Sequence, residues 1–274
     1  MTPALRRSAF SAVLVAALAL VLLFLALPIV AIFTSSSPSQ LVDSLGDPAA
    51  RDALWLSLRV TLVALAIIIV VGTPAAYLLA TRSFRGKAAV QTLIELPLVL
   101  PPAAAGIGLL AALGPHGLVG GALEDAGIEL VLQTAGVVVA LVFVSAPFYL
   151  RAAEAAIAAV PQQLIDASRT LGSGEAATFI RVVIPAARPG LLTGGALSWG
   201  RALGEFGATL MFAGSFREVT QTVPLAIYDR FADDFPGALA LSAVLVCVSF
   251  ALLLTIKLTV GRDAVRDGDP HAAR

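Results

Sequence analysis

The sequence is poor in charged residues. Only 13% of its 274 residues are Asp, Glu, Lys or Arg, and 18 basic residues balance 18 acidic ones. A soluble domain normally carries about 25% charged residues, so this chain has too few to cover a water-facing surface. The scarcity of charge argues against a soluble enzyme, a nucleic-acid-binding protein and a disordered chain.

Cysteine and histidine are scarce as well. The single cysteine, Cys247, excludes an intrachain disulfide and a cysteine-based metal cluster. His116 lies in an expected outer loop and His271 in the C-terminal tail, so neither suits a protease site inside a membrane. The sequence has no GxxxxGK[ST] phosphate loop, which excludes ATP binding by that motif. We therefore expect no catalytic residue, no metal and no cofactor in this chain.

Apolar residues are abundant and make up 58% of the chain. A transmembrane helix needs roughly 20 predominantly apolar residues in succession. The first run is longer than the apolar core of a signal peptide, which has about 7 to 15 residues, so we interpret it as a true span. We expect an all-α, polytopic membrane protein with six transmembrane helices, near residues 9–33, 60–81, 96–113, 130–150, 189–213 and 235–256.

The distribution of lysine and arginine predicts the orientation. With a cytoplasmic N-terminus, 13 of these residues fall in inner segments and 4 in outer segments, and Arg201 lies within a span. Short cytoplasmic loops carry an excess of positive charge. Both termini are therefore predicted to be cytoplasmic.

Prolines mark two local features. Asp47 followed by Pro48 is typical of a helix N-terminus, which indicates that the second helix begins before its apolar run. The third span contains Pro97, Pro101 and Pro102. Because proline removes a backbone donor, we expect a kinked helix there, packed against protein and not against lipid.

One cytoplasmic connection, between the fourth and fifth spans, is nearly 40 residues long and has helical signals of its own. Pro161 is placed to start a short helix that ends at Leu171, with Gly172 as its C-terminal cap. Ser173 is placed to cap a second helix that reaches Pro185. Periodicity alone leaves two interpretations open: a docking element, or a solvated loop with incidental helicity.

The run DASRTLGSGEAATFIRVVIP, residues 166–185, resembles the EAA loop of bacterial and archaeal ABC importer permeases. That signature is Glu-Ala-Ala, three residues, Gly, nine residues and Ile-x-Leu-Pro, and the spacing here matches it. Asp replaces Glu, Ser replaces Ala, Val replaces Ile and Ile replaces Leu. The resemblance implies a coupling helix that sits in a groove of a cytoplasmic ATPase subunit, with docking residues Asp166, Ala167, Ser168, Leu171, Gly172, Val182 and Pro185.

A narrower resemblance points to the substrate. The segments RALGEFGATLMFAGSF (201–216), TQTVPLAIY (220–228) and LPLVLPP (96–102) are similar to molybdate ABC transporter permeases. Sulfate and thiosulfate permeases are similar around Gly-Glu-Phe-Gly, but the continuation Ala-Thr-Leu-Met-Phe-Ala-Gly favours molybdate. The resemblance implies a type I importer permease in the cytoplasmic (inner) membrane. Its implied partners are a second copy of the chain, two ATPase subunits that bind the ATP, and an extracytoplasmic molybdate-binding protein.

The resemblance covers about residues 55–257 and suggests a division of the chain. Residues 1–54 would form the first transmembrane helix and an outer connection. Residues 55–257 would form the importer core, with the coupling loop at 161–185, and residues 258–274 a cytoplasmic tail.

The expected fifth helix carries two charges four residues apart, Arg201 and Glu205, which are placed to pair on one face. An unpaired charge near the membrane centre costs about 2.5 to 3.5 kcal/mol on insertion scales. The pair has two possible roles: to attract an oxyanion and moderate its binding, or only to brace the bundle. Hydroxyl groups of Thr193, Ser198 and Thr209 are further candidates for lining a translocation path.

Three alternatives remain open from the sequence. The substrate could be sulfate, thiosulfate or tungstate. A secondary carrier could use Glu205 as its proton site, since it is the only acid within an expected span. A membrane scaffold would transport nothing. The spacing of the cytoplasmic loop favours the importer over the last two.

Overall fold

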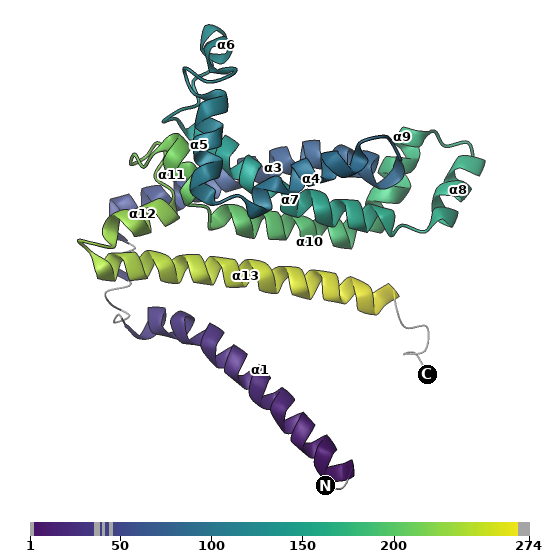
Figure 1. Ribbon diagram of the computed structural model, residues 1–274, viewed down its shortest axis with the longest axis horizontal. Helices are drawn as coiled ribbons and strands as arrows, with labels where there is room; N and C mark the ends of the chain where they lie inside the picture. The colour runs from purple at the N-terminus through teal and green to yellow at the C-terminus, as the bar shows by residue number, and fades with distance from the viewer. Residues whose placement is uncertain (1–2, 36–38, 40–41, 44–45, 268–274) are drawn as a thin grey trace.

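The structure is a computed structural model that describes residues 3–35, 39, 42–43 and 46–267 (Figure 1). Every regular element in this part of the chain is a helix, which confirms the predicted all-α class. The elements are α1 (Pro3–Thr34), α3 (Pro48–Thr81), α4 (Lys87–Val99), α5 (Pro102–Leu113), α6 (Gly120–Asp125), α7 (Thr134–Ala158), α8 (Gln162–Thr170), α9 (Glu175–Thr178), the π-helix η1 (Phe179–Val183), α10 (Ile184–Leu203), α11 (Gly207–Ala213), α12 (Val223–Arg230) and α13 (Phe235–Asp267).

The long helices run side by side (Figure 1). Helix α10 packs on α7, α3 and α13, and α7 also packs on α3. Helices α8 and α9 lie at one end of this bundle, and α11 and α12 lie at the other. Helix α1 leaves the bundle at an angle and packs beside α13. The boundaries proposed at 54/55 and 257/258 fall inside α3 and α13.

Within the described part of the chain, four helices are long and apolar enough to cross a membrane, in α1, α3, α7 and α13. The bent pair of α4 and α5 makes a fifth if it is counted as one span. Helix α10, the core of the expected fifth span, does not qualify, because Arg188 and Arg201 lower its hydropathy. A helix that packs against three others has little need of an apolar surface for lipid. The expected number of six spans is therefore not confirmed.

The predicted start of α3 is confirmed. The Asp47 carboxylate accepts a hydrogen bond from the Ala49 backbone N–H at 3.2 Å, and Pro48 is the first residue of the helix. Proline is favoured there because the first N–H groups of a helix have no partner within it. The helix then continues without a break to Thr81.

Small residues let α10 approach α7 closely. A Cβ atom added at Gly194 would lie 2.8 Å from the Cβ of Ala152, and one at Gly190 would overlap with Ala156. Ser198 continues this stripe, and its hydroxyl donates to the carbonyl oxygen of Ser145 at 2.9 Å. The close contact of the two backbones follows from these side chains, as in other membrane bundles.

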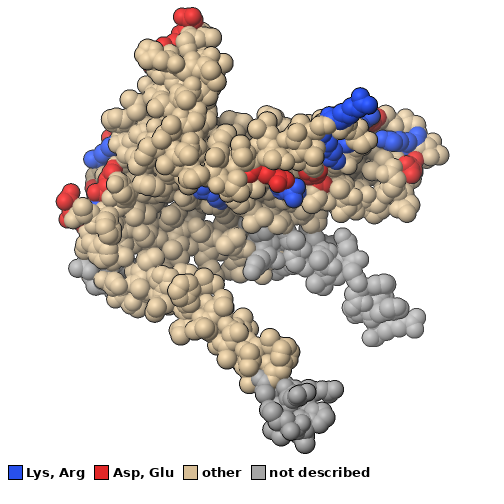
Figure 2. Space-filling model, viewed as in Figure 1, with Lys and Arg blue, Asp and Glu red and all other residues tan. Residues whose placement is uncertain are grey.

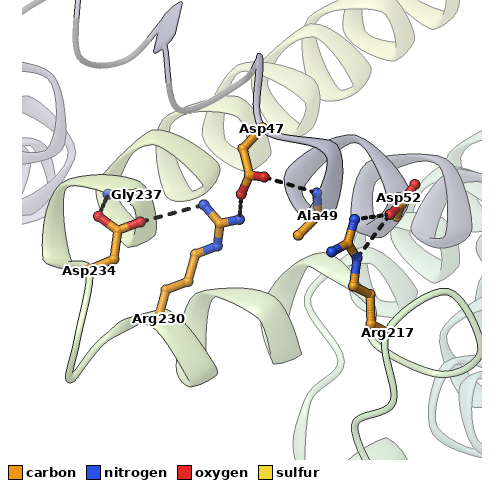
Figure 3. Close-up of polar contacts among 7 residues, drawn as sticks. All are labelled: Asp47, Ala49, Asp52, Arg217, Arg230, Asp234 and Gly237. Carbon is orange, nitrogen blue, oxygen red and sulfur yellow. Dashed lines mark hydrogen bonds and ion pairs between the residues drawn. The ribbon is translucent and has the colours of Figure 1, made fainter.

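Ion pairs fasten the bundle at the end opposite α8 (Figure 3). Arg230, at the end of α12, lies between Asp47 and Asp234, 3.6 Å from the latter. Arg217, in the loop after α11, donates to Asp52 from two nitrogens, at 2.8 and 3.1 Å. These contacts join the start of α3 to segments that follow it by more than 160 residues.

The pKa of Asp47 is lowered from its ordinary value of 3.8. Burial alone would raise it, but the hydrogen bonds from Arg230 and the Ala49 N–H, with the positive charges of Arg230 and Arg217, outweigh that effect. A carboxylate with a lowered pKa in the folded state stabilises the protein at pH values above its ordinary pKa. This stabilisation is lost as the pH falls through the lowered value.

We therefore predict that Arg230→Met lowers the thermal stability of the purified protein at pH 7. The difference from the unsubstituted protein should shrink as the pH is lowered below about 4, where Asp47 becomes protonated. Thermal unfolding in detergent from pH 7 to pH 3 measures this. Arg217→Met is the matched control, with a smaller effect expected because exposed ion pairs contribute only about 0 to 1 kcal/mol. If the difference in thermal stability between Arg230→Met and the unsubstituted protein stayed constant with pH, Arg230 would not stabilise the protein through the Asp47 carboxylate.

Candidate functional site

The cytoplasmic connection forms two short helices joined by a tight turn, as the sequence predicts. Helix α8 ends at Thr170, and Gly172 follows in a left-handed conformation with φ of 84°. The Gly172 N–H donates to the Arg169 carbonyl at 2.9 Å, and the Ser173 N–H donates to the Ser168 carbonyl at 3.1 Å. A Cβ atom at Gly172 would meet open space, so the turn requires glycine for its backbone angle and not for room.

Helix α8 has a buried and an exposed side. Ile165 is 8% exposed and packs in a hydrophobic cluster with Val160 and Val183, which fixes the helix against the end of the bundle. Leu171, by contrast, is 86% exposed. Of the residues predicted to dock, Asp166, Ala167, Leu171, Gly172 and Pro185 are exposed, and Ser168 and Val182 are partly buried.

Two predictions about the second short helix are wrong. Its N-cap is Gly174 and not Ser173, so no side chain caps it. The helix also does not stop at Pro185, because α9 continues through η1 directly into α10. Pro185 lies in the first turn of α10, which follows the π-helical segment. A π-turn changes the hydrogen-bond register locally and so accommodates a residue that lacks an N–H.

Two side-chain contacts join the connection to α3, and a third lies within the connection. Arg82, just after α3, forms an ion pair with Glu175 of α9 at 2.7 Å. The rings of Tyr77 and Phe179 lie 4.5 Å apart between their centroids. Within the loop, the hydroxyls of Ser168 and Thr178 are 3.0 Å apart and share a hydrogen bond. The end of α3 and the start of α9 are therefore joined by charge and by packing.

The predicted pairing of Arg201 with Glu205 is confirmed. Their side chains meet at 2.6 Å, and that of Glu205 is only 1% exposed, against 28% for Arg201. The second carboxylate oxygen of Glu205 accepts a hydrogen bond from the Ala208 N–H at 2.7 Å. One acid thus neutralises the arginine at the end of α10 and satisfies a backbone donor at the start of α11.

The helix expected to run through 213 is broken at this point. Helix α10 ends at Leu203 and α11 begins at Gly207, a correction to the expected span at 189–213. Arg201, Gly204 and Glu205 lie at this break. A continuous helix would leave fewer backbone N–H and C=O groups unpaired, and so fewer partners for the two charged side chains. The predicted kink in the third span is also a sharp break, because α4 and α5 are bent by 119° at Leu100 and Pro101.

The two broken helices meet each other. Helix α5 packs on α11, and Gly106 lies so close that an added Cβ would be 2.6 Å from the Cβ of Met211. Gly207 approaches Pro102 in the same way, at 2.7 Å. The expectation that the broken span packs against protein holds for α5, where Ala105, Gly106 and Leu109 are buried. Helix α4 packs on α7, where Gln91, Ile94 and Glu95 are partly buried, although none of its described residues is fully buried.

The three hydroxyl residues predicted to line a translocation path are buried within the chain to different extents. Ser198 and Thr209 are completely buried within the chain, while Thr193 is partly buried and donates to the Pro189 carbonyl at 2.9 Å. The Thr209 hydroxyl has no hydrogen-bond partner among the described residues. In this conformation only Thr193 and Arg201 of the candidate set reach a surface of the chain. Their role in a path stays a prediction.

A second polar cluster, between α4 and α7, was not predicted from the sequence. Arg151 of α7 pairs with Glu95 of α4 at 2.7 Å, and the amide of Gln91 donates to Glu154 at 2.7 Å. Glu205 is therefore not the only acid inside a possible span, because α4 begins at Lys87 and not at 96. The spacing of Gln91 and Glu95, one helical turn apart, was the available signal. Among the residues that the structure describes, no group of three or more His, Cys, Asp and Glu could hold a metal.

Comparison with known proteins agrees with this geometry. The family described as "Binding-protein-dependent transport system inner membrane component" matches residues 69–262. The chain is 38% identical to the molybdenum transport system permease protein ModB of Mycobacterium tuberculosis over 244 residues, which covers 88% of this chain and 92% of that protein. It is 31% identical to the probable sulfate transport system permease protein cysT of Chlorokybus atmophyticus, over 85% of this chain and 82% of that one.

A solved structure has the same fold. A chain of a bacterial ABC transporter involved in the import of the acidic polysaccharide alginate superposes with a TM-score of 0.72. The match covers 96% of this chain and 97% of that chain at 18% sequence identity. The likeness shows the type I importer permease fold.

We predict that Arg201→Met destabilises the protein by roughly 2 kcal/mol, less than the ~3 to 5 kcal/mol for a fully buried pair because Arg201 is partly exposed. The buried carboxylate of Glu205 would be left without its counter-charge. Adding Glu205→Gln should recover much of the loss, because the amide oxygen still accepts from the Ala208 N–H. Denaturant unfolding in mixed micelles compares the single and double variants. If the single variant Arg201→Met and the double variant Arg201→Met/Glu205→Gln had equal free energies of unfolding, the ion pair would not brace this break.

Proposed function

This chain belongs to the family of binding-protein-dependent transport system inner membrane components, and from this membership we propose that it imports molybdate as the membrane subunit of an ATP-driven transporter. The chain is a transport subunit and not an enzyme, and a separate subunit hydrolyses the ATP. Its partners are of the kinds that such importers use, a cytoplasmic ATPase and a binding protein outside the membrane. Its multi-pass location in a membrane follows from the family and from its long apolar helices.

One observation carries the choice of molybdate. The likeness to a molybdenum permease extends over nearly the whole of both chains, and it exceeds the likeness to the sulfate permease. Sulfate is the second candidate, because the sulfate relative also covers most of the chain. Both substrates are tetrahedral dianions, so the same positively charged and hydroxyl groups would serve either one.

We propose that helix α8 docks into the ATPase subunit and transmits its movement. The exposed Leu171 and Asp166 suit a protein surface, while buried Ile165 ties the helix to the bundle. Because α9, η1 and α10 are continuous, displacement of the loop moves α10 and the Arg201–Glu205 pair at its far end. Two copies of the chain would bring one docking helix to each of two ATPases. ATP binding and hydrolysis would then alternate the pair between outward and inward states.

The carrier alternative receives no support from the contacts of Glu205. Its carboxylate is fixed by Arg201 and by the Ala208 N–H, and its side chain is only 1% exposed. A carrier's proton site has to be reached from water in each cycle. We therefore assign Arg201 and Glu205 to the break between α10 and α11, with access to the translocation path when the helices separate.

The direct test is reconstitution in liposomes with the partner ATPase and binding protein. We expect molybdate to stimulate ATP hydrolysis and to accumulate inside, and tungstate to compete more strongly than sulfate. Uptake should stop when ATP is removed and persist when the proton gradient is collapsed. If sulfate competed more strongly than tungstate, sulfate would be the substrate and not molybdate. If the proton gradient alone drove uptake, the ATP-driven importer mechanism would be wrong.

A matched pair of glycine substitutions tests the docking helix. Gly172→Val places a β-branched residue at a left-handed position, which costs about 1 to 2 kcal/mol. Gly174→Val adds the same bulk two residues later, where φ is −69° and space is open. We expect the Gly172 variant to bind the ATPase about ten-fold more weakly and the Gly174 variant to bind nearly normally. Co-purification and titration measure this, and unchanged binding by the Gly172 variant would refute docking through this turn.

A further inference from the structure

The N-terminus of α12 is capped by a residue of another helix. The Val223 N–H, the first of α12, donates to the Ser57 hydroxyl of α3 at 2.7 Å, and this bond is buried. The residue at the N-cap position is Thr222, which has an extended backbone with φ of −72° and ψ of 169°. A threonine in this position normally accepts from the N–H two or three residues on. Thr222 does not, so the side-chain cap of α12 comes from α3 and not from its own N-cap residue.

The hydroxyl of Thr222 has no partner of its own. Thr222 is 3% exposed, and its Oγ1 makes no hydrogen bond among the described residues. A buried polar group without a partner costs free energy relative to one that is paired or hydrated. Pro224, two residues on, has no N–H to donate, but Leu225, three residues on, has one. Separation of α12 from α3 therefore breaks the bond to Ser57 and frees the Thr222 hydroxyl to pair with water or with the Leu225 N–H.

The apolar contact between the start of α12 and α3 is small. The cluster at this place contains Ala50 and Ala53 of α3, Val223 and Ala226 of α12, and Leu241 of α13. Each alanine contributes a single methyl group, so the two helices bury little apolar area against each other here. One hydrogen bond and a few methyl groups hold the start of α12 on α3.

The other end of α12 is held by charge. Arg230, its last residue, pairs with Asp47 before α3 and with Asp234 before α13 (Figure 3). Helix α12 has eight residues and is therefore about 12 Å long. Its start can move away from α3 while Arg230 keeps both of its partners.

The turn of α3 that caps α12 also receives α10. The Trp199 indole N–H donates to the Thr61 hydroxyl at 3.0 Å, and the Thr61 hydroxyl donates to the Ser57 carbonyl at 2.7 Å. Ser57 and Thr61 are four residues apart and lie on one face of α3. Trp199 lies near the end of α10, two residues before Arg201. Movement of α10 therefore acts on the same turn of α3 that holds the start of α12.

We propose that the start of α12 leaves Ser57 and returns to it in each transport cycle, with Arg230 as the pivot. Trp199 and Thr61 link this movement to α10. The transport cycle itself rests on the proposed function. Figure 2 shows acidic and basic atoms over the end of the bundle that carries α11 and α12, so the contact opens at a surface that faces water.

Two threonine substitutions test the exchange without any partner protein. Thr222→Val replaces the unpaired hydroxyl with a methyl group of similar shape, so the midpoint of thermal unfolding should rise by about 2 to 4 °C. Thr220→Val is the matched control, because Thr220 is completely buried but its Oγ1 accepts from the Phe216 N–H at 2.9 Å. Its midpoint should fall. A fall or no change for Thr222→Val would show that the hydroxyl costs nothing in this conformation, and would overturn the exchange.

Thiol labelling follows the movement itself. In a Cys247→Ala background, Ala226→Cys places the only thiol on the buried face of α12, where Ala226 is 3% exposed. In the transporter assembled in lipid nanodiscs, we expect a water-soluble maleimide to label this thiol several times faster during molybdate-stimulated ATP hydrolysis than at rest. Ala76→Cys, at a completely buried position of α3, should stay unlabelled in both conditions. Equal labelling of Ala226→Cys in the two conditions would show that α12 stays on α3.

Further substitutions in the Ala226→Cys protein separate the cap from the link to α10. Ser57→Ala should raise labelling at rest roughly five-fold, as expected for loss of one hydrogen bond, and Thr222→Val should slow it. Thr61→Val should reduce the difference between hydrolysis and rest, whereas Thr61→Ser keeps the hydroxyl and should preserve it. An unchanged difference in Thr61→Val would overturn the link. Absence of molybdate uptake by the unsubstituted transporter would reject the proposed function, whereas opposite stability changes in the two threonine variants would still report the exchange.

Discussion

The continuity of the helix from Glu175 to Leu203 is the constraint on which the arrangement depends. Helix α9, η1 and α10 form one unbroken rod about 40 Å long. One end is joined to α3 by the Arg82–Glu175 ion pair, and the other ends at the Arg201–Glu205 pair. A continuous helix of this kind transmits displacement along its axis, because no loop interrupts it. The proposed docking helix α8 joins this rod through the tight turn at residues 171–174, and no further loop separates the rod from the broken region.

The breaks in the other helices follow from the same rule of backbone satisfaction. Inside a membrane, an interrupted helix persists only where protein pairs the freed groups or a cavity hydrates them. At the α10–α11 break, Glu205 accepts from the Ala208 N–H. At the α4–α5 break, α11 covers α5 through Gly106 and Gly207, whose lack of side chains permits the contact. The two interruptions lie beside each other, because α11, which follows the α10 break, packs on α5.

Much of this could be predicted from the sequence because it depends on local chemistry. The Asp47–Pro48 start of α3, the turn at Gly172 and the pairing of Arg201 with Glu205 involve residues at most four apart in the chain, and all are confirmed.

The errors concern elements that tertiary contacts decide. Nothing near Pro185 signals that a π-turn carries the helix onward, and the break after Leu203 depends on packing with α5. The expected third span begins after Glu95, because the Arg151 that pairs with it lies 56 residues away in the sequence. Helix α10 is less apolar than the other long helices because it packs against α7, α3 and α13. In the Arg201–Glu205 and Arg151–Glu95 pairs a carboxylate neutralises the cation, which makes each arginine tolerable in a membrane bundle.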